Sequence, residues 1–350
     1  MTIANDNKSM IPGVQYLRGV AALMVVLFHS SPMVRNFIGM TTLAWGEFGV
    51  DIFFNISGFV MMHSVITAEK STSSIAFIKN RLIRIGPMYW LMTSLMTCIL
   101  IIKPTAFNSA VLSMDHYALS MLFIPHFHPG IEGAVLPMLV PGWTLSYEMY
   151  FYIVFSAALL LPHFFLFGWV LGVLAVVNII ARSGFIEQSA TSMFLGNSIV
   201  YEFTCGMFIA LLSRRGIYIP KWFAVIALPL ASSLIIFASS ADNRFVTVGL
   251  SATIILYSTL SFVVPTKKVV LSFFRLLGDS SYSLYLSHVF VIGLVSILWR
   301  KVFAVHAIET YLSAVLYLLL CCASSITVGA LLYKGVEIRL TRWIKFQLRS

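Results

Sequence analysis

The sequence predicts an all-α, polytopic integral membrane protein with about ten transmembrane helices and both termini in the cytoplasm. Composition, repeated apolar runs and the distribution of positive charge predict this class. Of the 350 residues, 59% are hydrophobic and only 10% are charged, whereas a soluble domain carries roughly 25% charged residues. The mean hydropathy is +0.92. These values exclude a soluble globular enzyme and a disordered chain.

Ten apolar runs approach the roughly 20 residues that a helix needs to cross a bilayer. They are residues 13–34, 48–68, 86–103, 144–161, 163–183, 193–213, 220–239, 245–265, 282–303 and 311–333. The proline-rich connection 104–143 is the one long loop, and loops of this length are usually functional, as lids or re-entrant segments. We expect a single transmembrane domain over residues 1–350, with 104–143 as a long loop on the outer side of the membrane and no soluble C-terminal domain.

The positive charges predict the orientation. Seventeen of the 23 Lys and Arg residues fall on the side of the N-terminus, and six fall on the opposite side. The seventeen are Lys8, Arg18, Lys70, Lys79, Arg81, Arg84, Arg214, Arg215, Lys221, Lys267, Lys268, Arg275, Lys334, Arg339, Arg342, Lys345 and Arg349; the six are Arg35, Lys103, Arg182, Arg244, Arg300 and Lys301. This bias places the N-terminal side in the cytoplasm. It assigns the net charge of +10 to topology and anionic lipid headgroups, not to nucleic acid.

Ionisable side chains at membrane depth mark candidate functional sites, because they cost several kcal/mol unless they face a cavity or a partner. Arg18 and His29 lie eleven residues apart in the first run, so they share one helical face about 16 Å apart along the axis. Asp51 and Glu148 begin the second and fourth runs on the outer side, at the level of His29. The alternatives are that His29 only bonds a neighbouring helix and that Asp51 lies in the interface.

A second candidate set lies on the inner side. Arg81 and Arg84 are three residues apart on one helical face, before Pro87, and could clamp a phosphate. They could equally be ordinary cytoplasmic anchors. Tyr282 and Ser283 belong to a hydroxyl-rich stretch that enters the ninth run.

The remaining histidines and the cysteines predict less. His126 and His128 alternate in Pro125–Pro129 and could hold a metal, but no third ligand of suitable spacing lies nearby in the sequence, so we interpret them as loop structure. Cys98, Cys205, Cys321 and Cys322 lie in apolar runs without zinc-ligand spacing and are interpreted as small buried hydrophobic residues. We therefore predict no metal site.

Several motifs resemble the acyltransferase family 3 integral membrane proteins. Arg18 to His29 matches the family's R-x10-H pattern, and Phe48–Phe59 resembles its second-helix motif, with Asn55 at a usually apolar place. The later segments Arg81–Tyr89, Pro141–Tyr152, Tyr201–Gly206 and Gly278–His288 follow in the family's order. Residues 120–152 are similar to the bacterial exopolysaccharide O-acetyltransferase branch. Glu337-Ile338-Arg339 departs from the pattern, which often has a proline after the glutamate.

The resemblance implies an acyltransferase of the bacterial inner membrane. It implies transfer of an acyl group, most simply acetyl, from cytoplasmic acyl-CoA to a hydroxyl of a surface polysaccharide or lipid-linked glycan. We expect His29 to be the general base or a transient acyl carrier, oriented by Asp51 or Glu148. Arg18, Arg81, Arg84, Tyr282 and Ser283 would bind the donor. A transporter or flippase of glycan intermediates is the main alternative, and a sensor or scaffold with a degenerate site is a third.

Overall fold

The computed structural model describes residues 11–38, 40–68, 72–107, 111–237, 244–262, 269–303 and 310–348. The predicted positive charges at Lys8, Lys70, Lys267, Lys268 and Arg349 lie outside these residues, as do the side chain of Arg35 and the predicted span ends at 238–239 and 263–265. Apart from one isolated bridge between Phe127 and Val135, the regular structure in these ranges is helical. The all-α prediction is confirmed.

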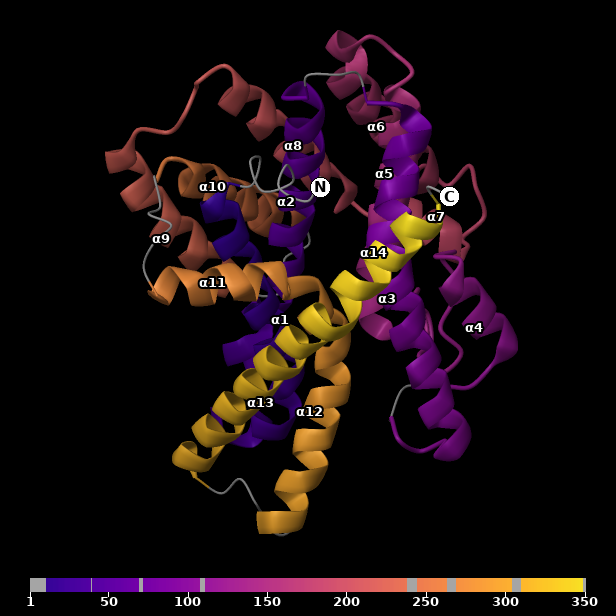
Figure 1. The fold of residues 1–350 in the computed structure, drawn as a ribbon, viewed down its shortest axis with the longest axis vertical. Helices are drawn as coiled ribbons and strands as arrows, with labels where there is room; N and C mark the ends of the chain where they lie inside the picture. Colours follow the sequence, from indigo (N-terminus) through magenta and orange to yellow (C-terminus); the bar gives the residue numbers. More distant parts are fainter. Residues whose placement is uncertain are drawn as a thin grey trace. The chain divides into compact units, whose positions relative to one another are not determined.

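The helices follow the predicted runs in order (Figure 1). They are α1 (Pro12–Ile38), η1 (Met40–Phe48), α2 (Gly49–Ile66), α3 (Ser74–Ile102), α4 (Met114–Met121), η2 (Val140–Gly142), α5 (Trp143–Ala158), η3 (His163–Phe165), α6 (Leu166–Arg182), α7 (Ala190–Leu195), α8 (Val200–Arg214), α9 (Lys221–Phe237), η4 (Phe245–Gly249), α10 (Leu250–Leu260), α11 (Val269–Asp279), α12 (Ser281–Phe303), α13 (Tyr311–Leu332), η5 (Tyr333–Glu337) and α14 (Ile338–Gln347).

Among the described residues, seven helical stretches are long and apolar enough to cross a membrane. Each of the ten predicted runs contains a helix, but α5, α9 and α10 have only 16, 17 and 11 residues. The chain is a multi-pass membrane protein. The number of ten crossings and the cytoplasmic termini stay predictions.

The chain forms two compact units. Unit 1 comprises Met1–Thr67 and Cys205–Gly335, and unit 2 comprises Ala68–Thr204 and Val336–Ser350. In unit 1, α1 packs against η1, α2, α11, α12 and α13, while α12 and α13 lie side by side (Figure 1). In unit 2, α3 packs against α4, α5 and α14, and α5 packs against α6.

Glycines bring the helices of unit 1 into close contact. A Cβ atom at Gly278 of α11 would lie 2.1 Å from the carbonyl oxygen of Gln15 in α1. At Gly206 of α8 it would lie 1.9 Å from the carbonyl oxygen of Asn55 in α2. Both distances are far below van der Waals contact, so only glycine permits these approaches. They set the positions of α1, α2 and α11, which carry the candidate site.

The structure corrects several expected boundaries. The helix α3 begins at Ser74 and continues through Pro87, so Arg81 and Arg84 lie inside it, not ahead of it. Proline removes one helical hydrogen bond, and the surrounding turns retain the helix. The 104–143 connection is not structureless, because it contains α4 and η2. The sixth predicted run is divided between α7 and α8, and Cys98 is exposed, so the expected burial is wrong for that cysteine.

Candidate functional site

His29 meets a second histidine in unit 1. Its ring lies 4.7 Å from that of His288 on α12, in an edge-to-face arrangement, and 5.0 Å from the ring of Phe28. The Nδ1 atom of His29 lies 3.0 Å from the carbonyl oxygen of Val25. A carbonyl can only accept, so Nδ1 carries the proton and Nε2 of the neutral ring holds a free lone pair. His29 is half-buried, which suits a base that a substrate can reach.

His288 has the same tautomer in a fully enclosed position. Its Nδ1 atom donates to the carbonyl oxygen of Tyr285, and none of its surface is exposed. Its Nε2 atom has no hydrogen-bond partner among the described residues. Buried polar atoms are normally paired, so the unpaired Nε2 atom of His288 beside His29 makes this pair of histidines a candidate functional site.

The predicted donor-binding residues of unit 1 gather at the opposite end of α1. Arg18 donates from Nη1 to Oε1 of Gln15 at 3.1 Å, and Gln15 in turn donates to the carboxylate of Asp279. Asp279 ends α11 directly before the first turn of α12, which carries Tyr282 and the buried Ser283. The structure therefore brings Arg18 to the helix junction that holds Tyr282 and Ser283.

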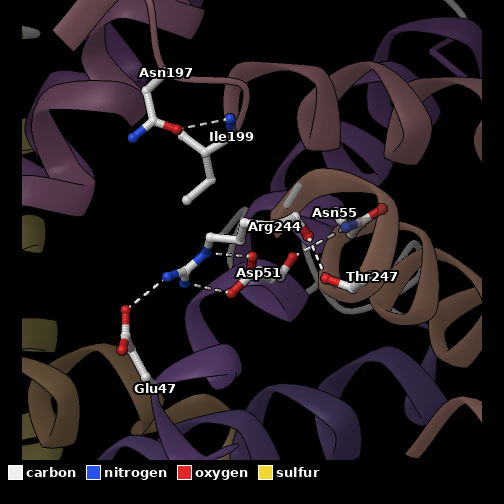
Figure 2. Close-up of polar contacts among 7 residues, drawn as sticks. All are labelled: Glu47, Asp51, Asn55, Asn197, Ile199, Arg244 and Thr247. Atoms are coloured by element: carbon white, nitrogen blue, oxygen red, sulfur yellow. Dashed lines mark hydrogen bonds and ion pairs between the residues drawn. The ribbon is translucent and has the colours of Figure 1, made fainter. Parts of the chain in front are cut away.

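Asp51 is bound by an arginine and not by His29. The guanidinium of Arg244 donates from Nε to Oδ1 at 3.1 Å and from Nη2 to Oδ2 at 2.8 Å (Figure 2). A third bond runs from Nη1 to Oε1 of Glu47 at 2.6 Å. The side chain of Asp51 is fully buried, whereas those of Arg244 and Glu47 are 30% and 40% exposed. Both Asp51 oxygens are thereby engaged by Arg244, which leaves its predicted role of orienting His29 unsupported.

Asn55 has a structural reason for its polar side chain. It is fully buried, donates from Nδ2 to the carbonyl oxygen of Asp51 at 3.0 Å, and accepts from the hydroxyl of Thr253 at 2.8 Å. The amide thus connects α2 to α10 one helical turn below Asp51. Figure 2 shows its bond to the Asp51 backbone to the right of the Arg244 contacts.

Glu148 belongs to unit 2. It lies half-buried in the second turn of α5, next to Tyr147, which donates its hydroxyl to the carbonyl oxygen of Phe194 at 3.1 Å and stacks on that ring at 4.0 Å. This aromatic contact fixes the start of α5. The predicted pairing of Glu148 with His29 would join the two units and stays a prediction.

Arg81 and Arg84 lie in the first half of α3. The guanidinium of Arg81 lies 5.4 Å from the centre of the Phe77 ring, a cation–π distance, and Arg84 is exposed. Beside them, a cavity of about 210 Å³ opens between α3 and α14 and is lined by Lys79, Asn80 and Lys345, among others. Two lysines thus line this cavity, and Arg81 and Arg84 lie in the same part of α3, which makes the region a candidate for binding phosphate groups.

The 104–143 segment assembles a histidine cluster that the sequence spacing did not reveal. Nδ1 of His116 in α4 lies 2.6 Å from Nε2 of His126, and its ring centre lies 4.8 Å from that of His128. Burial, followed by the charges of His126 and His128, lowers the pKa of His116 from 6.5 to about 4. No group of three or more His, Cys, Asp or Glu side chains suited to a metal ion occurs in the described ranges.

Sequence reasoning missed three residues of the site, namely Glu47, Arg244 and His288. His288 ends the Gly278–His288 motif, and its register in the ninth run would have placed it on the face of Ser281 and Tyr285, so a signal existed. Arg244 lies 193 positions from its partner Asp51, and no local pattern predicts that pairing.

Comparisons with known proteins agree with the motif resemblance. The family model described as "Acyltransferase domain" matches residues 11–334. The "Exopolysaccharide production protein ExoZ" of Rhizobium meliloti strain 1021 is 34% identical over 276 residues, which cover 77% of this chain and 83% of that protein. The "Putative membrane-bound transacylase BcsY" of Komagataeibacter xylinus is 31% identical over 153 residues, which cover 42% of this chain and 36% of that protein.

No solved structure is significantly similar to the chain. The family match spans nearly the whole sequence and includes α1, α2, α3 and α12, which carry most of the candidate residues. The chain therefore belongs to the acyltransferase family 3 of integral membrane acyltransferases.

Proposed function

We propose that the protein is an O-acetyltransferase of the bacterial inner membrane that moves an acetyl group from cytoplasmic acetyl-CoA to a hydroxyl of an exported or lipid-linked polysaccharide. The observation that carries this proposal is the position of His29 beside His288, with Nδ1 of His29 bonded to the Val25 carbonyl and Nε2 left as the acceptor, in a chain of the acyltransferase family. Similarity to an exopolysaccharide production protein supports a glycan as the acceptor.

In the proposed reaction, His29 acts as the general base. The acceptor oxygen attacks the thioester carbonyl carbon while its proton passes to Nε2 of His29. The carbon–sulfur bond then breaks, and the imidazolium returns the proton to the departing thiolate, which gives free CoA, the acetyl ester and neutral His29. A base placed in this way contributes about 10²- to 10⁴-fold in rate.

We further propose that cations bind the anionic nucleotide of the donor. Arg81, Arg84, Lys79 and Lys345 supply positive charge in unit 2, next to a cavity of about 210 Å³. Arg18 supplies it in unit 1, beside Tyr282 and Ser283 at the α11–α12 junction. Positive charge with planar donors is the usual means of binding phosphate.

The test is the acetyl content of the cell's own surface polysaccharide. A strain without the chromosomal copy is complemented with the wild-type chain or with His29→Ala, and the exported polysaccharide is analysed by mass spectrometry. Wild type restores O-acetyl groups and His29→Ala does not, while immunoblotting shows equal amounts of both proteins. Full acetylation with His29→Ala would refute the role of His29, and unchanged acetylation on deletion would refute the acceptor.

A further inference from the structure

Glu47 is held against the outer part of α1 by a close backbone approach. A Cβ atom at Gly46 would lie 2.3 Å from the carbonyl oxygen of Met24 and 3.0 Å from Cβ of Phe28. The 3₁₀ helix η1 therefore contacts α1 directly at the turn that precedes His29. Glu47, the next residue, is thereby held beside the turn of α1 that leads to His29.

Arg244 holds Glu47 in place. Its Nη1 atom donates to Oε1 of Glu47 at 2.6 Å, and its Nε and Nη2 atoms donate to the buried carboxylate of Asp51 (Figure 2). The guanidinium also lies 5.2 Å from the centre of the Phe48 ring. An arginine with an aromatic contact and three hydrogen bonds has little freedom, so the Glu47 carboxylate that it binds is oriented.

The charges of this cluster do not cancel. One guanidinium faces two carboxylates, which leaves one net negative charge. Both oxygens of Asp51 accept from Arg244, whereas only one oxygen of Glu47 does so. Glu47 is therefore the less fully neutralised of the two carboxylates, and it follows directly after Gly46, which contacts α1 at the turn before His29.

We propose that Glu47 is the electrostatic partner of His29 and that Arg244 is the positioning residue for Glu47. This inference rests on the proposed function of His29 as a base. His29 is neutral before the reaction and becomes an imidazolium while the acceptor proton is on Nε2. A carboxylate nearby stabilises that cation more than the neutral ring, so it stabilises the transition state more than the bound substrate.

The test compares Glu47→Gln with Glu47→Asp in inside-out membrane vesicles of the producing cells, which expose the cytoplasmic face and carry the cells' own acceptor. Transfer of radiolabelled acetyl groups is measured against acetyl-CoA concentration. Glu47→Gln is expected to lower kcat by about ten- to a hundredfold, the effect of one screened charge, with the KM for acetyl-CoA unchanged. Glu47→Asp keeps the charge and should recover part of kcat.

The matched control is Glu132→Gln, which removes an exposed carboxylate from the 104–143 segment and should leave kcat unchanged. Wild-type kcat in Glu47→Gln, or an equal loss in Glu47→Gln and Glu47→Asp, would overturn the inference. Should Glu47→Gln not fold, as judged by thermal unfolding, Glu47→Ala, which also removes the charge, takes its place, and wild-type kcat in that variant overturns the inference. Activity of His29→Ala separates the two proposals: an active His29→Ala refutes the proposed function, whereas an inactive one together with an unaffected Glu47→Gln refutes only the role of Glu47.

Discussion

The ion pair between Asp51 and Arg244 predicts an asymmetric response to mutation. The side chain of Asp51 is fully buried, whereas that of Arg244 is 30% exposed and also binds Glu47. Arg244→Gln leaves a buried carboxylate without its cation and should lower the free energy of unfolding by about 3–5 kcal/mol. Asp51→Asn leaves a cation that still reaches Glu47 and water, so it should lower the free energy of unfolding by only about 1–3 kcal/mol.

The double variant Asp51→Asn with Arg244→Gln should be less destabilised than the sum of the two single variants, because neither unpaired charge remains. The free energies are measured by denaturant titration of purified protein in mixed micelles. The reasoning is refuted if Asp51→Asn is at least as destabilising as Arg244→Gln, or if the two losses simply add. Either result would mean that the buried carboxylate does not depend on the guanidinium.

Three further predictions concern other parts of the chain. The pKa of His116 falls from 6.5 to about 4 on folding, so the unfolded state binds more protons between these values and stability should decline as the pH is lowered from 6.5 toward 4. Thermal unfolding measured across this pH range should show a smaller decline for His116→Gln than for the wild-type chain. An equal decline in both would contradict the assigned pKa. In the vesicle transfer assay, Arg81→Gln and Arg84→Gln should each raise the KM for acetyl-CoA about tenfold, because each loses one charge-assisted hydrogen bond. Arg215→Gln, which changes an exposed arginine, is the control. Equal KM values in all three variants would show that Arg81 and Arg84 are only cytoplasmic anchors. Gly278→Ala should destabilise unit 1, because its Cβ would lie 2.1 Å from the carbonyl oxygen of Gln15. Gly293→Ala, whose Cβ would have nothing within 4 Å, should leave the unfolding temperature nearly unchanged. Similar unfolding temperatures for the two variants would refute the close approach of α1 and α11.

The sequence predicts the helical elements of this chain better than its charge partners. Hydropathy located a helix in each run, because membrane helices must satisfy their backbone hydrogen bonds internally. It missed the start of α3 at Ser74, because the polar first half of that helix does not look like a span. Single proline residues such as Pro87 also do not end a long helix when the adjacent turns remain intact.

The candidate site was predicted in part. The R-x10-H spacing singled out Arg18 and His29 correctly as members of one helix, and Tyr282 and Ser283 lie near Arg18 at the α11–α12 junction. The orientation of His29 by Asp51 could not be judged from the sequence, because the partner of Asp51 is Arg244, which comes from a distant segment. Contacts between distant segments depend on helix packing, and that packing is set by positions such as Gly46 and Gly278 whose role is invisible in a hydropathy profile.

The central claim is that His29 drives acyl transfer from CoA, and release of free CoA by purified protein tests it most directly. The wild-type chain and His29→Ala are reconstituted in liposomes that contain extracted lipid-linked glycan, acetyl-CoA is added, and free thiol is measured against time. We predict acceptor-dependent thiol release by the wild-type chain and none above background by His29→Ala. Movement of glycan across the bilayer without thiol release, or equal release by both chains, would contradict the account.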